Sequence, residues 1–180
     1  HVNNEKILFY EESMYQSVMV TSNPEGNALK LNGKVQCNLI PKTADGLVRL
    51  GSFPIELFEY NYGSPQRGLN IGLGCGVTSL VLSKQMDTTT LEIDPSVVKA
   101  NKFFHDEIDH NLIVDDARNW LLRNNEKFDI ITSEPTDPWN GWQLYTIEYF
   151  SLLSNRVSEN GLVSQWVPAF ELPDDNFTRF

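Results

Sequence analysis

The chain has 180 residues, a length that fits one α/β domain with a small appendage and allows a sizeable buried core. Its 24 acidic and 14 basic residues give a net charge of −10, which argues against binding to nucleic acid or an anionic membrane surface and favours a cationic ligand. No apolar run approaches the roughly 18 residues of a membrane span, and no signal peptide is visible. The two cysteines, Cys37 and Cys75, favour a reducing compartment, and each is expected to be a buried free thiol.

The first 61 residues are expected to form a small antiparallel β unit followed by a helix. Short alternating runs separated by turn signals at 23–26 and 32–34 predict strands over 7–10, 16–20, 28–31 and 35–39. Residues 44–61 have a mostly helical pattern, with interruptions expected near Gly51 and Pro54, and 62–68 resemble a linker. We therefore predict one unit over 1–61 and a second over 62–180.

From Gly68 onward, strands alternate with helical stretches. The predicted strands are 69–71, 88–93, 111–114, 128–132 and 162–167, and the helices between them are 77–85, 95–104, 117–124 and 144–157. Such alternation predicts an α/β fold with a parallel sheet and right-handed crossovers.

Three glycines, Gly72, Gly74 and Gly76, separate the first of these strands from its helix. A turn of this kind lets a ligand approach bare backbone at the start of a helix. Because Val77 stands where dinucleotide-binding motifs have a third glycine, the spacing favours an adenosyl ligand such as S-adenosylmethionine over a pyrophosphate. A turn with only a structural role is the alternative.

Acidic residues follow the next three strands, and the carboxyl ends of parallel strands share one crevice. Glu92 is placed to accept hydrogen bonds from both hydroxyls of a ribose. Asp116 is a candidate acceptor for an adenine amino group, and Asp115 is expected to cap the following helix. Glu134 and Asp137 come after the fourth strand.

Glu134 and Asp137 are candidates for binding a protonated amine and removing its proton, because prolines stiffen the segment that carries them. A plain turn is the alternative reading of this segment. Trp139 and Trp142 are candidate walls of the amine pocket through cation–π contact, whereas Trp166 is expected to pack in the core. His105 and His110 have no partners at metal-ligand spacing, so they are expected at the surface or at helix ends, and no metal site is predicted.

Taken in order, several segments resemble the spermidine synthase family, the polyamine aminopropyltransferases of the class I methyltransferase-like fold. The resemblance is closest to the branch in which such a domain is often fused to membrane transporter segments. It is carried by the segments 11–16 (EESMYQ), 31–36 (LNGKVQ), 71–76 (IGLGCG), 91–95 (LEIDP), 115–118 (DDAR), 133–138 (SEPTDP), 144–146 (LYT) and 165–166 (QW).

The resemblance implies that decarboxylated S-adenosylmethionine is the donor and a diamine such as putrescine the acceptor, with no metal. It also implies a cytoplasmic enzyme, with a homodimer as the expected assembly. The implied donor-binding residues are Gln16, Gly72, Gly74, Cys75, Gly76, Glu92 and Asp116. Glu134 would match the family's catalytic aspartate and act as the base, with Asp137 beside it, and Asp137, Trp139 and Tyr145 would contact the acceptor.

Two departures from the family pattern keep other functions open. Cys75 stands where the family usually has an aspartate near the donor's amine, and Glu134 is one methylene longer than the usual aspartate. Without the aspartate, ordinary S-adenosylmethionine is better tolerated, so a methyltransferase is the first alternative. A non-catalytic binding or regulatory domain is the second. Relatives continue past Phe180, so the strand at 162–167 is expected to be an exposed edge.

Overall fold

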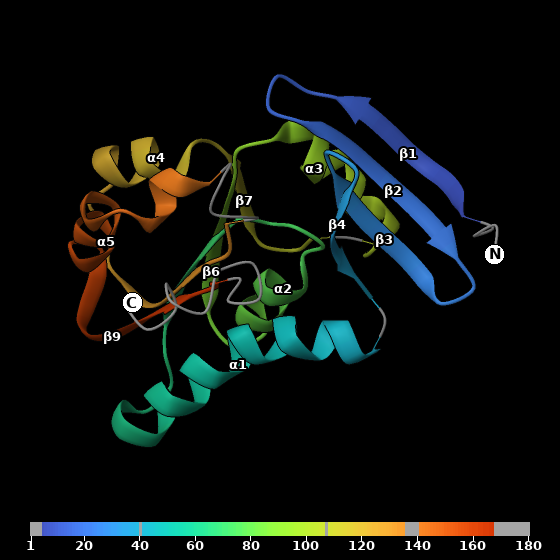
Figure 1. Ribbon diagram of the computed structural model, residues 1–180. Helices are drawn as coiled ribbons and strands as arrows, with labels where there is room; N and C mark the ends of the chain where they lie inside the picture. The colour runs from blue at the N-terminus through green and yellow to red at the C-terminus, as the bar shows by residue number, and fades with distance from the viewer. Residues whose placement is uncertain (1–4, 40, 107, 136–140, 168–180) are drawn as a thin grey trace, which may run out of the picture.

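The computed structural model describes residues 5–39, 41–106, 108–135 and 141–167. Two sheets account for the described strands, and helices flank the larger one (Figure 1). The smaller sheet, drawn in blue, lies beside the end of the larger sheet from which the glycine-containing turn emerges. No helix in these described ranges is long and apolar enough to cross a membrane.

The N-terminal sheet is antiparallel, as predicted. Its four strands pair in chain order: β1 (Lys6–Glu12), β2 (Ser17–Asn23), β3 (Gly26–Leu31) and β4 (Lys34–Asn38). The β2–β3 turn is closed by the Asn23 side chain, which accepts a hydrogen bond from the Glu25 amide at 2.8 Å. The β3–β4 turn has Asn32 and Gly33 at positive φ, as two-residue hairpin turns require.

Helix α1 (Pro41–Tyr62) is continuous, so the predicted interruption is wrong. Pro54 lies inside it, although proline removes a helical hydrogen bond. Packing outweighs that cost, because Ile55 and Phe58 on the following turn are buried against Leu82 of α2. Gly51 serves the same contact, since a Cβ there would meet Val81 at 3.0 Å. The glycine therefore permits close approach of the two helices.

The larger sheet is parallel, which confirms the predicted fold class. Its strand order is β7-β6-β5-β8-β9, and every described pair in it is parallel. The strands are β5 (Arg67–Ile71), β6 (Asp87–Glu92), β7 (Asn111–Val114), β8 (Phe128–Ser133) and β9 (Val157–Gln165). The helices are α2 (Val77–Ser83), α3 (Pro95–Ala100), α4 (Ala117–Arg123) and α5 (Ile147–Ser154), with short 3-10 turns η1 (Asn101–Phe103) and η2 (Trp142–Tyr145).

The boundary between α5 and β9 differs from the prediction. The helix ends at Ser154 and the strand begins at Val157, five residues earlier than the predicted 162. Gly161 lies within β9, where the pairing register with β8 shifts. A Cβ at this glycine would lie 2.8 Å from the Phe128 carbonyl oxygen. Gly161 therefore marks an irregularity inside a strand rather than a turn before it.

Three apolar clusters hold the described structure together. One lies between the parallel sheet and α1 and α2, and includes Ile55, Leu82 and Ile130. A second lies under α4 and α5 and includes the fully buried Phe128 and Tyr149. The third joins the N-terminal sheet to the glycine-containing turn and to α3, and is described below. Trp166 is 37% exposed, so the prediction that it packs in the core is wrong.

Candidate functional site

The carboxyl ends of β5, β6, β7 and β8 meet at one edge of the parallel sheet, as predicted. Backbone hydrogen bonds continue the sheet one residue past these ends and tie the following loops together. They are Gly72 N to Leu91 O at 2.9 Å, Asp115 N to Glu92 O at 3.0 Å, Glu134 N to Ile71 O at 2.8 Å, and Trp166 N to Ser133 O at 2.8 Å. The predicted acids at 92, 115, 116 and 134 therefore lie along a single edge.

The glycine turn, residues 72–76, connects β5 to α2. Gly72, Gly74 and Gly76 all have positive φ, at 93°, 50° and 77°, which a side chain would strain. Gly72 also lies against the loop after β8, because a Cβ there would be 2.9 Å from the Glu134 carbonyl oxygen. The glycines thus bring the turn into contact with the candidate catalytic residue.

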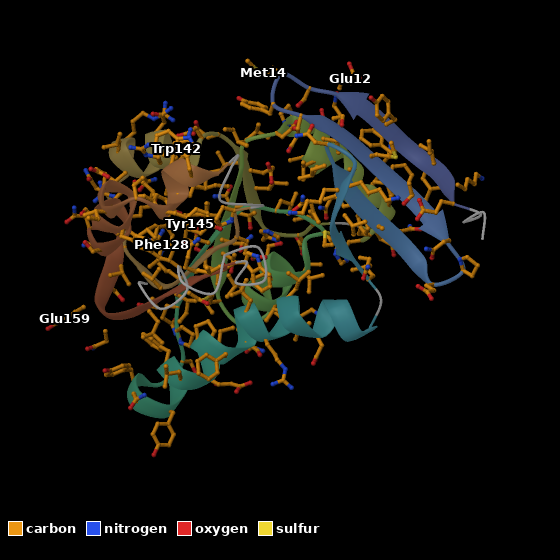
Figure 2. The ribbon with its side chains drawn as sticks, viewed as in Figure 1. Glu12, Met14, Phe128, Trp142, Tyr145 and Glu159 are labelled. Atoms are coloured by element: carbon orange, nitrogen blue, oxygen red, sulfur yellow. A yellow bond between two sulfur atoms is a disulfide. The ribbon has the colours of Figure 1, made fainter. Side chains whose placement is uncertain are left out.

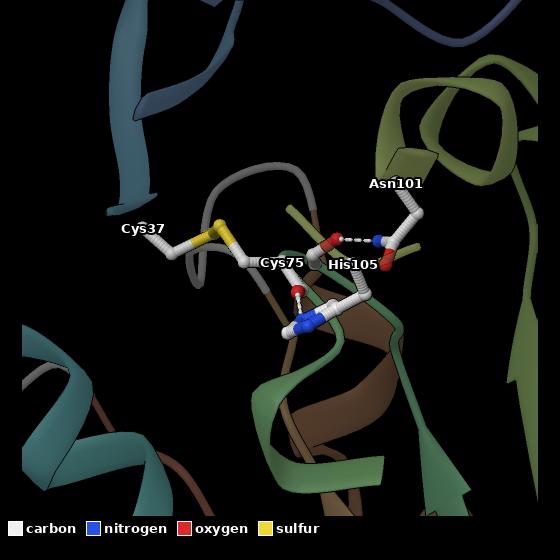
Figure 3. The surroundings of a disulfide bond; sticks show 5 residues. Cys37, Cys75, Asn101 and His105 are labelled. Carbon is white, nitrogen blue, oxygen red and sulfur yellow. Dashed lines mark hydrogen bonds between the residues drawn. A yellow bond between two sulfur atoms is a disulfide. The ribbon is translucent and has the colours of Figure 1, made fainter. Parts of the chain in front are cut away.

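Two side chains that the sequence analysis did not assign to the site hold the glycine turn from the α3 side (Figure 3). Asn101 donates from Nδ2 to the Gly74 carbonyl oxygen at 2.7 Å. His105 lies just past the end of η1, and its Nε2 is 2.6 Å from the Cys75 carbonyl oxygen. Because a carbonyl only accepts, Nε2 is the protonated ring nitrogen in this contact. No sequence motif marks either residue.

A disulfide joins Cys37, in β4, to Cys75 of the glycine turn, with a Cα–Cα distance of 6.1 Å. The prediction of two free thiols is therefore wrong. The cysteines are 38 residues apart in sequence, and only the packing of the N-terminal sheet against the turn brings them together. Both residues are buried, at 4% and 2% exposed. Cys75, a predicted donor-binding residue, thus carries neither a charge nor a free thiol.

Glu92 ends β6, and both of its carboxylate oxygens are engaged by backbone amides. Oε2 accepts from Leu73 N of the glycine turn and Oε1 from Asp94 N, both at 2.9 Å. Burial raises the pKa of this carboxyl, and the two amides act in the opposite direction. Because each carboxylate oxygen can accept a second hydrogen bond, Glu92 retains capacity for a ligand's hydroxyls.

Gln16 reaches this end of β6 from the turn between β1 and β2. Its Nε2 donates to Asp94 Oδ2 at 3.2 Å, and the Ser13 hydroxyl donates to the same oxygen at 2.7 Å. Asp94 also caps α3 by accepting from Ser96 N at 2.9 Å. The N-terminal sheet is therefore hydrogen-bonded to the candidate ribose site through Asp94, a role the sequence analysis did not assign.

The helix cap after β7 falls on the other aspartate of the pair than the one predicted. Asp116, not Asp115, is the N-cap of α4, accepting from Asn119 N at 2.8 Å. Asp115 accepts from Asp116 N at 2.8 Å and pairs with Arg123. The prediction that Asp115 caps the helix is wrong, because α4 begins at Ala117, as predicted, and the cap is the residue directly before it.

Glu134 follows β8 and has a strongly perturbed pKa. Burial raises its pKa from 4.5 to about 8, partly offset by a hydrogen bond with the Thr78 side chain. Its Oε1 is out of contact with solvent and has no hydrogen-bond partner among the described residues. A buried carboxyl oxygen without a partner is costly and is typical of functional sites. Asp137 and Trp139 lie outside the described residues.

Tyr149 supports the end of β8 from α5. Its hydroxyl is 2.8 Å from the Ser133 hydroxyl, next to Glu134 in sequence. Burial raises the pKa of Tyr149, and the charges of Tyr145 and Asp116 add to this effect. Tyr145, in η2, donates to the Trp166 carbonyl oxygen at 3.3 Å. Trp142 is 58% exposed, and Figure 2 places it with Tyr145 on the α5 side of the molecule.

A hollow of about 410 Å³ opens where the β1–β2 turn faces the ends of β6 and β7. Ile93, which follows Glu92, and Val114, which precedes Asp115, line one part of it. Met14 and Tyr15 line the other, and Met14 lies at the tip of the hairpin in Figure 2. Among the described residues, no cluster of three or more histidine, cysteine, aspartate or glutamate side chains is arranged to hold a metal ion.

Two family models match the sequence. The spermine/spermidine synthase domain matches residues 56–174, and the spermidine synthase tetramerisation domain matches residues 2–38. A polyamine aminopropyltransferase of Yersinia pestis (strain Pestoides F) is 27% identical over 171 residues, which are 88% of this chain and 56% of the relative. One from Oceanobacillus iheyensis is 29% identical over 181 residues, covering 91% of this chain and 34% of the relative. The chain thus spans about half, or less, of these relatives.

Solved structures share the fold. Spermidine synthase from Thermotoga maritima superposes with a TM-score of 0.76 at 21% identity, covering 89% of this chain and 56% of that one. A SAM-dependent methyltransferase from Agrobacterium tumefaciens gives 0.60 at 16% identity, covering 94% and 58%. These likenesses confirm the predicted methyltransferase-type α/β fold with its N-terminal β unit.

Proposed function

Because the chain belongs to the spermine/spermidine synthase family, we propose that it transfers an aminopropyl group from decarboxylated S-adenosylmethionine to a diamine such as putrescine. The chain covers only part of its relatives' length, so activity, donor and acceptor are all part of the proposal. The observation that carries it is the buried, unpartnered carboxyl of Glu134 beside Gly72.

Glu134 is the proposed base. A diamine nitrogen with a pKa near 10.4 is protonated at pH 7, and freeing its lone pair costs about 4–5 kcal/mol. Glu134 accepts that proton as the amine nitrogen attacks the aminopropyl carbon. The new C–N bond forms while the C–S bond breaks, and its electron pair leaves on sulfur as a neutral thioether. A base with a pKa of about 8 is well matched to this task.

The donor is held at the ends of β5, β6 and β7 in this proposal. Glu92 accepts from the ribose hydroxyls, and the glycine turn, including Gly74 and Gly76, contacts the donor through bare backbone. The adenine ring enters the hollow beside Ile93 and Val114, with its amino group directed to Asp116. Gln16 closes the site from the N-terminal sheet through its hydrogen bond to Asp94.

The acceptor is assigned to the α5 side of Glu134. Asp137 binds its distal ammonium, while Trp139 and Tyr145 line its path. The described part of this assignment rests on Tyr145, which bridges η2 to the backbone after β9. We propose no metal in the reaction, since the leaving thioether is neutral and needs no acid.

The experiment that tests the proposal combines calorimetry and product analysis. Decarboxylated and ordinary S-adenosylmethionine are titrated separately into the protein, and aminopropyl transfer to putrescine is followed by mass spectrometry. We expect tighter binding of the decarboxylated donor and formation of spermidine. Binding of neither donor would remove both the transferase proposal and its closest alternative.

A methyltransferase is the second candidate, favoured by the state of Cys75. The disulfide occupies the position at which an acid would face the donor's aminopropyl ammonium. Preferential binding of ordinary S-adenosylmethionine would support this alternative. Binding of a donor with no product from any amine would instead support a non-catalytic binding or regulatory domain.

The proposal also covers the oligomeric assembly of the protein, its cellular location and the branch of the family to which it is related. The match to a tetramerisation domain over residues 2–38 supports self-association through the N-terminal sheet, and a homodimer is the predicted form. Family membership supports a cytoplasmic location, although the disulfide weighs against it because such bonds persist mainly in oxidising compartments. Kinship with the transporter-fused branch rests on the sequence motifs alone.

A further inference from the structure

The glycine turn is held from two opposite sides. Asn101 and His105 bind the carbonyl oxygens of Gly74 and Cys75 from the α3 side. The disulfide holds the Cys75 side chain from β4 of the N-terminal sheet (Figure 3). The two hydrogen bonds can break and reform as the backbone moves, whereas the covalent bond fixes the turn to the sheet.

The N-terminal sheet is a firm anchor for this bond. Cys37 lies in a buried apolar cluster with Val18 and Leu29, both fully buried, and this cluster includes Leu73 and Cys75 of the turn. Gln16, in the turn between β1 and β2 of this sheet, is hydrogen-bonded to Asp94, two residues past the end of β6. The sheet therefore contacts both the turn and the segment that follows the candidate ribose acid.

Displacement of the turn would be transmitted to Glu92. The Leu73 amide donates to Glu92 Oε2 at 2.9 Å, and Gly76 N closes the turn by donating to Leu73 O at 2.7 Å. A shift of the turn therefore removes one of the two amides that orient the Glu92 carboxylate. Orientation errors of about half an ångström are enough to weaken a preorganised site.

We propose that the Cys37–Cys75 disulfide positions the glycine turn for donor binding, so that donor affinity depends on the oxidation state of this pair. Cys37 and Cys75 are positioning residues that act through Leu73 and Glu92. The inference rests on the proposed function for the identity of the donor, but the restraint that the disulfide places on the glycine turn can be tested with no donor present.

Reduction of the pair needs a dithiol, for which dithiothreitol serves as the probe. Its thiolate attacks one cysteine sulfur, which breaks the S–S bond, releases the other cysteine as a thiolate and forms a mixed disulfide. The reagent's second thiol then attacks the reagent sulfur of that mixed disulfide, so that a ring closes and the remaining cysteine leaves as a thiolate. Two electrons and two protons end on the thiols of Cys37 and Cys75, while the reagent is oxidised to its cyclic disulfide. Because both cysteines are buried, attack requires the turn to open first.

The first test uses hydrogen exchange without donor. Cys37→Ser removes the bridge while leaving the sequence of the turn intact. We expect the amides of Leu73 and Gly76 to exchange at least about tenfold faster in this variant, as for loss of a coupling of 1–3 kcal/mol. The amide of Leu69, inside β5, serves as the internal reference and should not change. Equal exchange in the variant and the oxidised parent overturns the proposal.

The second test measures the affinity of the protein for the donor. We expect Cys37→Ser, and the parent reduced by dithiothreitol, to bind decarboxylated S-adenosylmethionine about tenfold more weakly, with KM raised and kcat little changed. Val18→Ala is the matched control, since it weakens the same apolar cluster and keeps the bridge. Equal weakening by Val18→Ala would show that general loss of stability is responsible and would overturn the proposal.

The third test uses reciprocity. If the closed turn binds the donor, saturating donor must protect the disulfide against reduction at equilibrium in a dithiothreitol redox buffer, by the factor by which oxidation tightens donor binding. A purely structural disulfide far from the ligand would show no such protection. Failure of the oxidised parent to bind any donor would contradict the proposed function. The hydrogen-exchange test would then show by itself whether the disulfide restrains the glycine turn. Two alkylatable thiols in protein purified without reductant would refute the bridge directly.

Discussion

Glu92 and Glu134 end the two strands that flank β5, yet their surroundings differ. Glu92 has an amide donor on each oxygen, at 2.9 Å in both cases; burial raises its pKa, and these hydrogen bonds offset only part of that rise. Glu134 has one oxygen without a partner among the described residues, and burial raises its pKa to about 8. The two carboxyls therefore differ in their contacts rather than in the direction of their pKa shifts, and this difference supports the proposal that Glu92 binds the donor while the unpartnered oxygen of Glu134 accepts a proton.

The largest expected effect follows from removing the base. Glu134→Gln keeps the size of the side chain but cannot accept a proton, so we expect transfer to fall by about 10²–10⁴-fold. Donor affinity should not change, because Glu92 and the glycine turn are untouched. Rates come from product formation at saturating donor, and affinity from calorimetry. A parallel loss of donor affinity would contradict the division of roles between the two glutamates.

Glu92→Ala tests the other half of the comparison. Hydrogen bonds to a charged group contribute about 1.5–3 kcal/mol each, so losing those to one or two ribose hydroxyls should weaken donor binding by roughly 10–10³-fold or more. Glu159→Ala, at an exposed position of β9, is the matched control with the same change in charge. Donor affinity equal to that of the parent would overturn the ribose assignment.

Gly72→Ala tests the glycine turn, which contacts both glutamates. The added methyl would lie 2.9 Å from the Glu134 carbonyl oxygen, and Gly72 has a φ of 93°, so either the glycine turn or the segment after β8 must move. We expect a loss of about 1–3 kcal/mol in the free energy of unfolding, as for other strained backbone positions. Thermal unfolding with and without donor measures it. Gly46→Ala, with open space around the new methyl inside α1, is the control and should not destabilise the protein.

The smallest effect concerns the pH dependence of stability. Below pH 4.5 Glu134 is protonated in both folded and unfolded chains, so its raised pKa has no net effect there. Between 4.5 and about 8 the folded chain retains a proton that the unfolded chain has lost, so this contribution to stability falls as pH rises. Glu134→Gln lacks the effect and should gain stability relative to the parent over this window, as followed by urea unfolding. A constant difference across it would mean that the carboxyl is not perturbed.

The strand segments and the position of the acids could be predicted from the sequence because both depend on local patterns. Alternating apolar runs and turn signals identified the four strands of the N-terminal sheet. Each acid was found because it directly follows an apolar strand, and parallel strands bring their ends together. Glu92 and Glu134 lie where this reasoning places them, beside the glycine turn.

The features that were missed depend on contacts between distant segments. Cys37 and Cys75 are bonded because β4 packs on the glycine turn, and nothing near either cysteine in the sequence indicates this. Asn101 and His105 reach the turn from the end of α3, without a recognisable spacing. The continuity of α1 through Pro54 likewise follows from tertiary packing, which outweighs the local preference of proline.

The apolar cluster shared by Val20, Leu31, Leu73 and Val97 also has a consequence for how the protein unfolds. Its members come from the N-terminal sheet, the glycine turn and α3, so neither side can lose its structure without exposing the buried surface of the other. The parallel-sheet unit therefore depends on the antiparallel sheet for part of its buried core and is expected to be less stable without it. Thermal melting should show one cooperative transition, and a fragment beginning at residue 41 should melt at a lower temperature even though it retains α1 and every strand of the parallel sheet.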